Sequence, residues 1–141
     1  MKKILSIIIL FLSTTTLSAN DRDVELDKLF LELKKNIPSL SSGIAQQIWM
    51  LWSTHPTDQK LTSILDEGSR LVQDQQLNRA IDVFTEAIKL DPTWAEAWNK
   101  RATVFYMVGE FQKSQDDIDK VLELEERHFG ALAGQGMVNI K

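Results

Sequence analysis

A chain of 141 residues with 43% hydrophobic and 26% charged residues supports one globular domain and excludes a disordered or collagen-like polymer. Its formal net charge is −4 and charges of both signs are interspersed, which excludes the basic patch that a nucleic-acid partner requires. The chain has no cysteine, so a fold without disulfide bonds is expected and lipid attachment through an N-terminal cysteine is excluded.

Residues 1–19 have the three-part pattern of a secretory signal peptide. A basic start precedes an apolar run from Ile4 to Leu12, and small, mostly polar residues follow as far as Ala19. The apolar run is shorter than the ~20 residues that span a bilayer. We therefore expect cleavage after Ala19 or Ser18, a periplasmic or secreted product, and no stable membrane insertion after cleavage. An uncleaved membrane anchor is the alternative.

Residues 20–56 are predicted to form a helical hairpin that caps the fold. Asp23 to Lys35 has apolar residues at helical spacing, and Pro38 ends that pattern. A second helix is expected to begin near Ser41 or Ser42 and carries a wide apolar arc: Ile44, Ala45, Ile48, Trp49, Leu51 and Trp52. This arc is expected to lie between the first helix and the helices that follow. The alternative is that a tryptophan of the arc stays partly exposed and binds a partner.

The rest of the chain repeats itself at an interval of 34 residues. Ile64, Trp98 and Leu132 form one column of the repeat, and the small residues Gly68, Ala102 and Gly136 form another. Small residues allow helices to approach closely, and larger residues fill the remaining space. The pattern therefore predicts pairs of helices that stack and share one core.

Turn and cap residues divide each repeat into two helices. A proline follows Asp91, Thr93 and Glu96 have the spacing of a capping box, and Gly109 is suited to end a helix. The predicted helices span residues 58–73, 77–90, 95–108 and 111–124, and a further helix begins at Phe129.

These columns resemble the tetratricopeptide repeat (TPR) family over residues 61–128, with matching residues at Gly68, Ala80, Trp98 and Ala102. The resemblance implies an all-α fold, a short α-solenoid of antiparallel helix pairs. The TPR domain would cover residues 57–141, with repeats at about 61–94 and 95–128 and a partial third at 129–141. With the segment from Ile48 to Trp52, the chain also looks like a group of small secreted proteobacterial TPR proteins.

Few residues suit catalysis. His55 and His128 have no second histidine or cysteine at the spacing of metal ligands, and the carboxylate-rich segments suit a solvated helix face. We therefore predict a protein that is not an enzyme and that binds no cofactor or metal.

In TPR proteins the first helix of each repeat lines a concave groove, and the resemblance places eight residues there: Leu65, Ser69, Val72, Asn99, Lys100, Thr103, Tyr106 and Met107. Asn99 and Lys100 are expected to have no role in the core. The Lys and Asn residues with which some TPR proteins bind a C-terminal carboxylate are absent from the corresponding positions.

The predicted function is an exported adaptor or assembly factor that binds a protein or peptide segment in this groove. Two alternatives are a self-associating structural envelope protein, forming a homo-oligomer through its open C-terminal helix, and a non-catalytic subunit of an envelope enzyme complex.

Overall fold

The computed structural model describes residues 19–139, and within that range the chain is almost entirely helical. The signal-peptide prediction falls on residues 1–18, which lie outside this range. No strand occurs between residues 19 and 139, which confirms the all-α architecture. The helices are α1 (Ala19–Lys34), α2 (Pro38–Ser53), α3 (Gln59–Gln73), α4 (Leu77–Leu90), α5 (Ala95–Met107), α6 (Phe111–Leu124) and α7 (Phe129–Val138).

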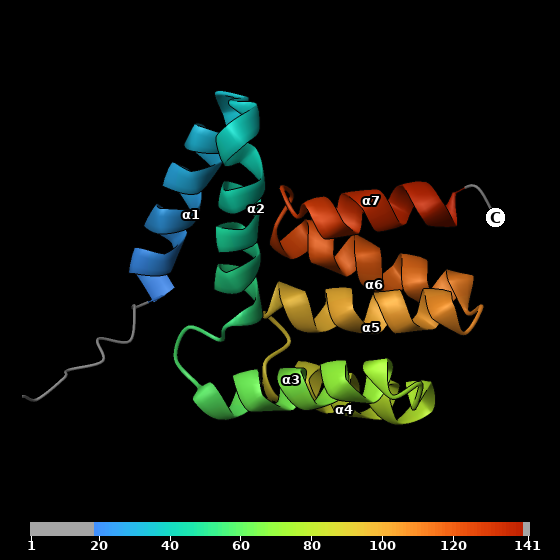
Figure 1. Ribbon diagram of the computed structural model, residues 1–141. Coiled ribbons are helices and arrows are strands. Elements are labelled where there is room, and N and C mark those ends of the chain that lie inside the picture. Colours follow the sequence, from blue (N-terminus) through green and yellow to red (C-terminus); the bar gives the residue numbers. More distant parts are fainter. Residues whose placement is uncertain (1–18, 140–141) are drawn as a thin grey trace, which may run out of the picture.

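Helices α3 to α7 lie side by side and alternate in direction, as stacked helix pairs do (Figure 1). The hairpin of α1 and α2 runs across one end of this stack, where α3, α5 and α7 begin (Figure 1). The molecule therefore has two parts: a repeat stack, α3 to α7, and an N-terminal hairpin, α1 and α2.

The small-residue columns lie where α3 to α6 approach one another. Gly68 is buried, and a Cβ atom at this position would overlap the Phe84 ring of α4. Ala102 is also buried, and the Ser114 hydroxyl of α6 donates a hydrogen bond to its carbonyl oxygen over 2.9 Å. The packing predicted from the 34-residue interval is therefore confirmed.

An ion pair reinforces the stacking of the two full repeats. The Arg101 guanidinium on α5 donates to both carboxylate oxygens of Asp117 on α6, over 2.8 and 2.7 Å. It also donates to the Thr85 hydroxyl on α4 over 3.0 Å. One partly buried side chain therefore joins three consecutive helices, in the two-pronged geometry that makes arginine–carboxylate pairs strong.

Two of the predicted helix ends are confirmed. The Asp58 side chain accepts a hydrogen bond from the backbone N–H of Lys60 at the start of α3, over 2.8 Å. Gly109 follows α5 with a φ of +83°, in the left-handed region that favours glycine after a helix.

The predicted capping box at Thr93 and Glu96 is wrong. The Thr93 hydroxyl donates to the Asp91 carboxylate over 2.6 Å, and α5 begins after Trp94 without a side-chain cap. Glu96 points into the protein, where His128 and Asn99 bind its carboxylate. Partners distant in the chain have replaced the local pairing.

The start of the second helix also differs from the prediction. Helix α2 begins at Pro38, not at Ser41 or Ser42. Proline is well suited to the first turn of a helix because its missing N–H would have no partner there. Ser41 then bonds its hydroxyl to the Ile37 carbonyl oxygen instead of capping a helix.

The aromatic arc of α2 does not lie between α1 and the first full repeat, as expected. The Trp52 ring stacks on His128 with 4.0 Å between ring centres, and Trp49 lies edge-on to Phe129. The Trp94 indole at the start of α5 donates to the Trp52 carbonyl oxygen over 2.8 Å. The N-terminal hairpin is therefore fixed to the first residues of α5 and α7.

An arginine fixes the first helix to the same region. Arg127, just before α7, pairs with Asp27 of α1 over 2.7 Å, and its guanidinium lies 4.5 Å from the centre of the Phe30 ring. The two neighbouring acids, Asp27 and Glu125, outweigh the effect of partial burial and raise the pKa of Arg127 above its ordinary value.

Candidate functional site

A groove of about 370 Å³ lies between the inner sides of α3 and α5. Its lining is mainly apolar, with Val72 of α3, Phe84 of α4 and Val104 of α5. Trp49 of α2 also lines it, so the N-terminal hairpin contributes directly to the site. The remaining lining residues are Ser69, Gln73, Asn99, Lys100 and Thr103.

Two of the polar lining residues also bind a buried carboxylate. Glu96 lies one turn before Lys100 on α5, and its side chain is fully buried. The Asn99 amide donates to Glu96 Oε2 over 3.1 Å, and Lys100 Nζ lies 3.4 Å from Glu96 Oε1. The expectation that Asn99 and Lys100 have no core role is therefore wrong. Both compensate a charge that would be costly to bury alone.

His128 completes this polar cluster from the side of α7. Its Nε2 lies 2.9 Å from Glu96 Oε2, and its Nδ1 accepts from the backbone N–H of Ala131, which fixes the start of α7. The ring is fully buried against Trp52. Lys100 in turn lies 5.6 Å from the centre of the Trp49 ring. We call Glu96, Asn99, Lys100 and His128 the junction cluster, because it joins α5, α7 and α2.

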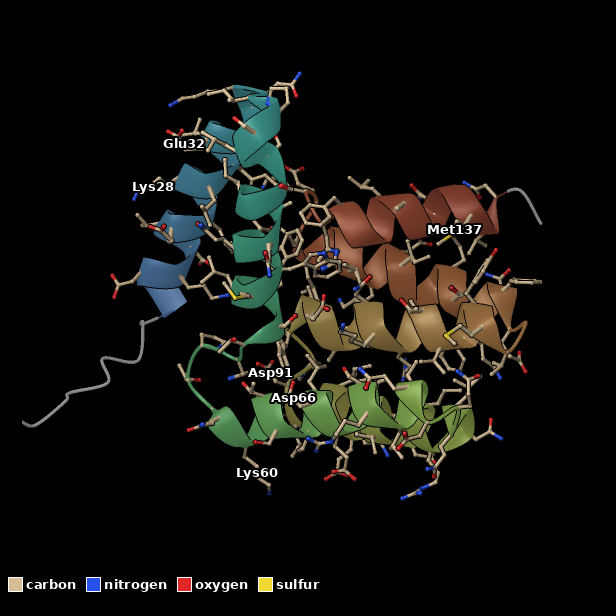
Figure 2. The ribbon with its side chains drawn as sticks, in the orientation of Figure 1. Lys28, Glu32, Lys60, Asp66, Asp91 and Met137 are labelled. Atoms are coloured by element: carbon tan, nitrogen blue, oxygen red, sulfur yellow. The ribbon has the colours of Figure 1, made fainter. Side chains whose placement is uncertain are left out.

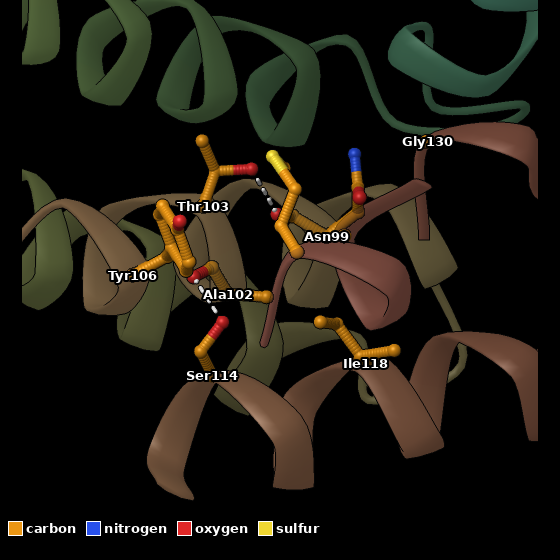
Figure 3. Close-up of a pocket in the computed structure, with 9 residues that line it drawn as sticks. Asn99, Ala102, Thr103, Tyr106, Ser114, Ile118 and Gly130 are labelled. Atoms are coloured by element: carbon orange, nitrogen blue, oxygen red, sulfur yellow. Dashed lines mark hydrogen bonds between the residues drawn. The ribbon is translucent and has the colours of Figure 1, made fainter. Parts of the chain in front are cut away.

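A smaller pocket lies beside the groove, between α5, α6 and α7, and Figure 3 shows its lining. Asn99 and Thr103 line both depressions, so the pocket and the groove share one wall. Gly130 and Gly134 of α7 line the pocket without a side chain, and a Cβ at Gly134 would come within 3.2 Å of Ile118. Tyr106 and Met137 also line it.

The structure brings together most of the residues predicted for the groove. Five of them line it: Ser69, Val72, Asn99, Lys100 and Thr103. Tyr106 lines the smaller pocket and packs on Phe111 with 5.4 Å between ring centres. Leu65 is 1% exposed and belongs to the core, and the exposed Met107 lines neither depression.

Sequence reasoning missed three contributors to the site. Trp49 was assigned to the packing of the N-terminal hairpin, Glu96 to a helix cap and His128 to a repeat junction. The only available signal was position: His128 is 34 residues after Trp94, so both occupy the residue before an inner helix. Both side chains contact Trp52.

Other types of site were also considered. Between residues 19 and 139, no three His, Asp or Glu side chains are grouped so that they could hold a metal ion. Within the same range, no helix is long and apolar enough to cross a membrane.

Comparison with known proteins gives a family match in the repeat stack. The family model described as TPR repeat matches residues 68–109. A TPR repeat-containing protein of Rhizobium etli is 36% identical over 114 residues, which cover 80% of this chain and 55% of that protein.

Two more distant relatives are eukaryotic. Sperm-associated antigen 1 of Rattus norvegicus is 29% identical over 91 residues, covering 60% of this chain and 10% of that protein. A tetratricopeptide repeat and J domain-containing co-chaperone of Cryptococcus neoformans is 26% identical over 88 residues, covering 62% of this chain and 16% of that protein. The chain thus spans about half the length of the R. etli relative and a small part of the other two.

Proposed function

This chain is a tetratricopeptide-repeat protein, and on that premise we propose that it binds a segment of another protein in the groove between α3 and α5. We further propose that it acts as an exported adaptor or assembly factor in the periplasm or outside the cell. The repeats imply a module for protein–protein interaction, and TPR proteins are in general non-catalytic scaffolds.

One observation carries the proposal for the groove: an apolar floor with polar groups at its edge. Val72, Phe84 and Val104 form apolar surface, while Thr103 is exposed beside them. Such a surface suits a helix or extended segment that buries apolar side chains and keeps its polar edge in water.

The remaining parts of the proposal have separate support. Export rests on the signal-peptide pattern of residues 1–19. The role in assembly agrees with the name of one relative, which is a co-chaperone.

Site-specific photo-crosslinking in the source organism tests the groove. A photoreactive amino acid is placed at Ser69 or Thr103, which line the groove, and as a control at Asn78 or Glu86, which are exposed on α4. We expect one shared protein adduct from both groove positions and none from α4. The substitution Val72→Glu, which places a charge on the apolar floor, should abolish the adduct at Thr103. Equal labelling from the groove and from α4 would remove the groove as the binding surface.

A further inference from the structure

The chain lacks charge along one continuous segment. From Asn36 to Thr57 there is no Asp, Glu, Lys or Arg, although 26% of the whole chain is charged. This segment contains all 16 residues of α2. A helix without charge is expected inside a protein, because exposed helix faces normally carry charged side chains. The position of α2 therefore decides what its composition means.

Helix α2 is buried on one side only. Ile48 and Trp52 face the interior, but six residues on the opposite side are exposed and lie at helical spacing: Ser39, Leu40, Gly43, Gln46, Gln47 and Met50. We call these six residues the outer face of α2. Its apolar side chains are open to solvent, with 52% of Leu40 and 58% of Met50 exposed.

Gly43 makes the middle of this face flat. A Cβ atom at Gly43 would meet nothing within 4 Å, so no packing inside the chain requires glycine there. Glycine in a helix interior costs about 1 kcal/mol relative to alanine. Small residues on an exposed helix allow the backbone of another helix to come close. The outer face thus has the composition of a helix–helix contact whose second helix is missing.

The charges beside this face are already paired within α1. Lys28 pairs with Glu25 over 3.5 Å, and Lys35 pairs with Glu32 over 2.6 Å. Lys28 and Glu32 lie on the side of the N-terminal hairpin that faces away from the repeat stack (Figure 2). A depression of about 380 Å³ separates them from Gly43 and Leu40 of α2. Its border therefore alternates in sign, while the outer face itself is neutral.

This charge pattern favours an identical partner. A two-fold axis brings the same surface together twice, so a charge near the axis would repel its own copy. A neutral centre avoids that repulsion in an acidic chain, and a border with both signs can pair with its rotated copy. We propose that the chain forms a two-fold symmetric dimer in which the outer faces of α2 from two copies pack together around Gly43. The dimer is independent of the proposed function, since the outer face of α2 contributes nothing to the groove between α3 and α5.

The interface is expected to be small. A helix of 16 residues is about 24 Å long at ~1.5 Å per residue, so two such faces bury less surface than a permanent dimer does. The expected dissociation constant is micromolar, and sedimentation equilibrium from about 1 to 300 µM covers that range.

Two glycine substitutions test the assignment on the mature protein. Gly43→Arg places a charge on the outer face of α2, and Gly136→Arg places the same side chain on α7. A Cβ atom meets nothing within 4 Å at either position, so each variant should fold like the wild type, which thermal melting checks. The Gly136 variant also tests the earlier alternative of an oligomer formed through the C-terminal helix.

We expect the wild type to dimerise with rising concentration, Gly43→Arg to weaken the dimer at least tenfold, and Gly136→Arg to match the wild type. A wild type that stays monomeric throughout overturns the proposal. So does a dimer that Gly43→Arg leaves intact, or one that both substitutions weaken equally. Groove crosslinking by a monomeric wild type would show that this inference fails while the proposed function stands.

Discussion

The repeat stack and the N-terminal hairpin reach the same density of packing by different means. In the stack, contacts recur by column: Gly68 meets Phe84, and Ala102 meets Ser114 after the same kind of turn. In the hairpin, contacts are individual, such as the Trp52 ring on His128. Columns can be read from a period in the sequence, because each repeat offers the next one the same surface. Individual contacts join residues with no shared pattern.

The two regions also differ in how they treat buried charge. Arg101 and Asp117 form a two-pronged ion pair within one repeat, close to the surface. The junction cluster buries Glu96 and His128 completely, where three separate elements meet. A buried charge confers little net stability, but removing its partner is costly. The hairpin should therefore be the more sensitive of the two regions to a single polar substitution.

The largest predicted effect comes from His128→Ala. The substitution leaves the Glu96 carboxylate without its 2.9 Å partner and opens a cavity under the Trp52 ring. We expect a loss of about 3–5 kcal/mol in the free energy of unfolding, a large part of the total for a small domain. Urea unfolding followed by circular dichroism measures it.

The double variant with Glu96→Gln identifies the cause of that loss. If an unpaired buried charge dominates, the added Glu96→Gln should recover part of the stability, because the amide is neutral. A loss below about 1 kcal/mol for His128→Ala alone would show that the junction cluster does not hold the hairpin in place.

Gly68→Ala has the next largest effect and tests the repeat stack. The added methyl group would overlap the Phe84 ring, so α3 and α4 must move apart. Overpacking of this kind costs about 1–3 kcal/mol, which exceeds the gain of up to ~1 kcal/mol in helix propensity. Thermal melting should show a lower midpoint.

Gly136→Ala is the matched control, since Gly136 stands in the same column two repeats later. Nothing lies within 4 Å of its Cβ position, so only the gain in helix propensity of up to ~1 kcal/mol remains. We expect opposite signs for the two glycines. Equal effects would mean that the column does not determine the packing at Gly68.

The fold was largely predictable because its signals are local and periodic. The interval of 34 residues placed Gly68 and Ala102 at helix contacts, and Gly109 ended α5 as expected. The same reasoning placed Ser69, Val72 and Thr103 in the groove, since inner helices are equivalent by column.

The rest of the site depended on where the hairpin docks, which no period specifies. Glu96 could satisfy a local capping box or a distant histidine, and the sequence alone favours the local choice. Once His128 binds it, Asn99 and Lys100 acquire structural roles and Trp49 becomes part of the groove. Leu65 shows the converse error, because a residue one turn from the groove can belong wholly to the core.

The smallest predicted effect concerns the link between the two regions. His55, in the loop between α2 and α3, places its Nε2 2.8 Å from the Asp91 carboxylate at the end of α4. Partial burial alone would raise the pKa of Asp91, but hydrogen bonds from Thr93 and His55 outweigh it, and the pKa lies below its ordinary value of 3.8. A carboxyl group with a lowered pKa stabilises the fold above its unfolded pKa, and that contribution is lost as the pH falls through the folded value.

Asp91→Asn removes that dependence and should cost less than about 1 kcal/mol at pH 7, since Asp91 is partly exposed and water screens the interaction. Below about pH 4 the difference between wild type and variant should shrink, because the protonated Asp91 of the wild type no longer offers a charge. Urea midpoints measured from pH 7 to pH 2.5 follow both curves, with Asp82→Asn on the exposed side of α4 as the control. Parallel curves for wild type and Asp91→Asn would show that the ionised carboxylate does not tie the hairpin loop to the repeats. Converging curves would show that even this peripheral contact is held by a specific charge, as the junction cluster is.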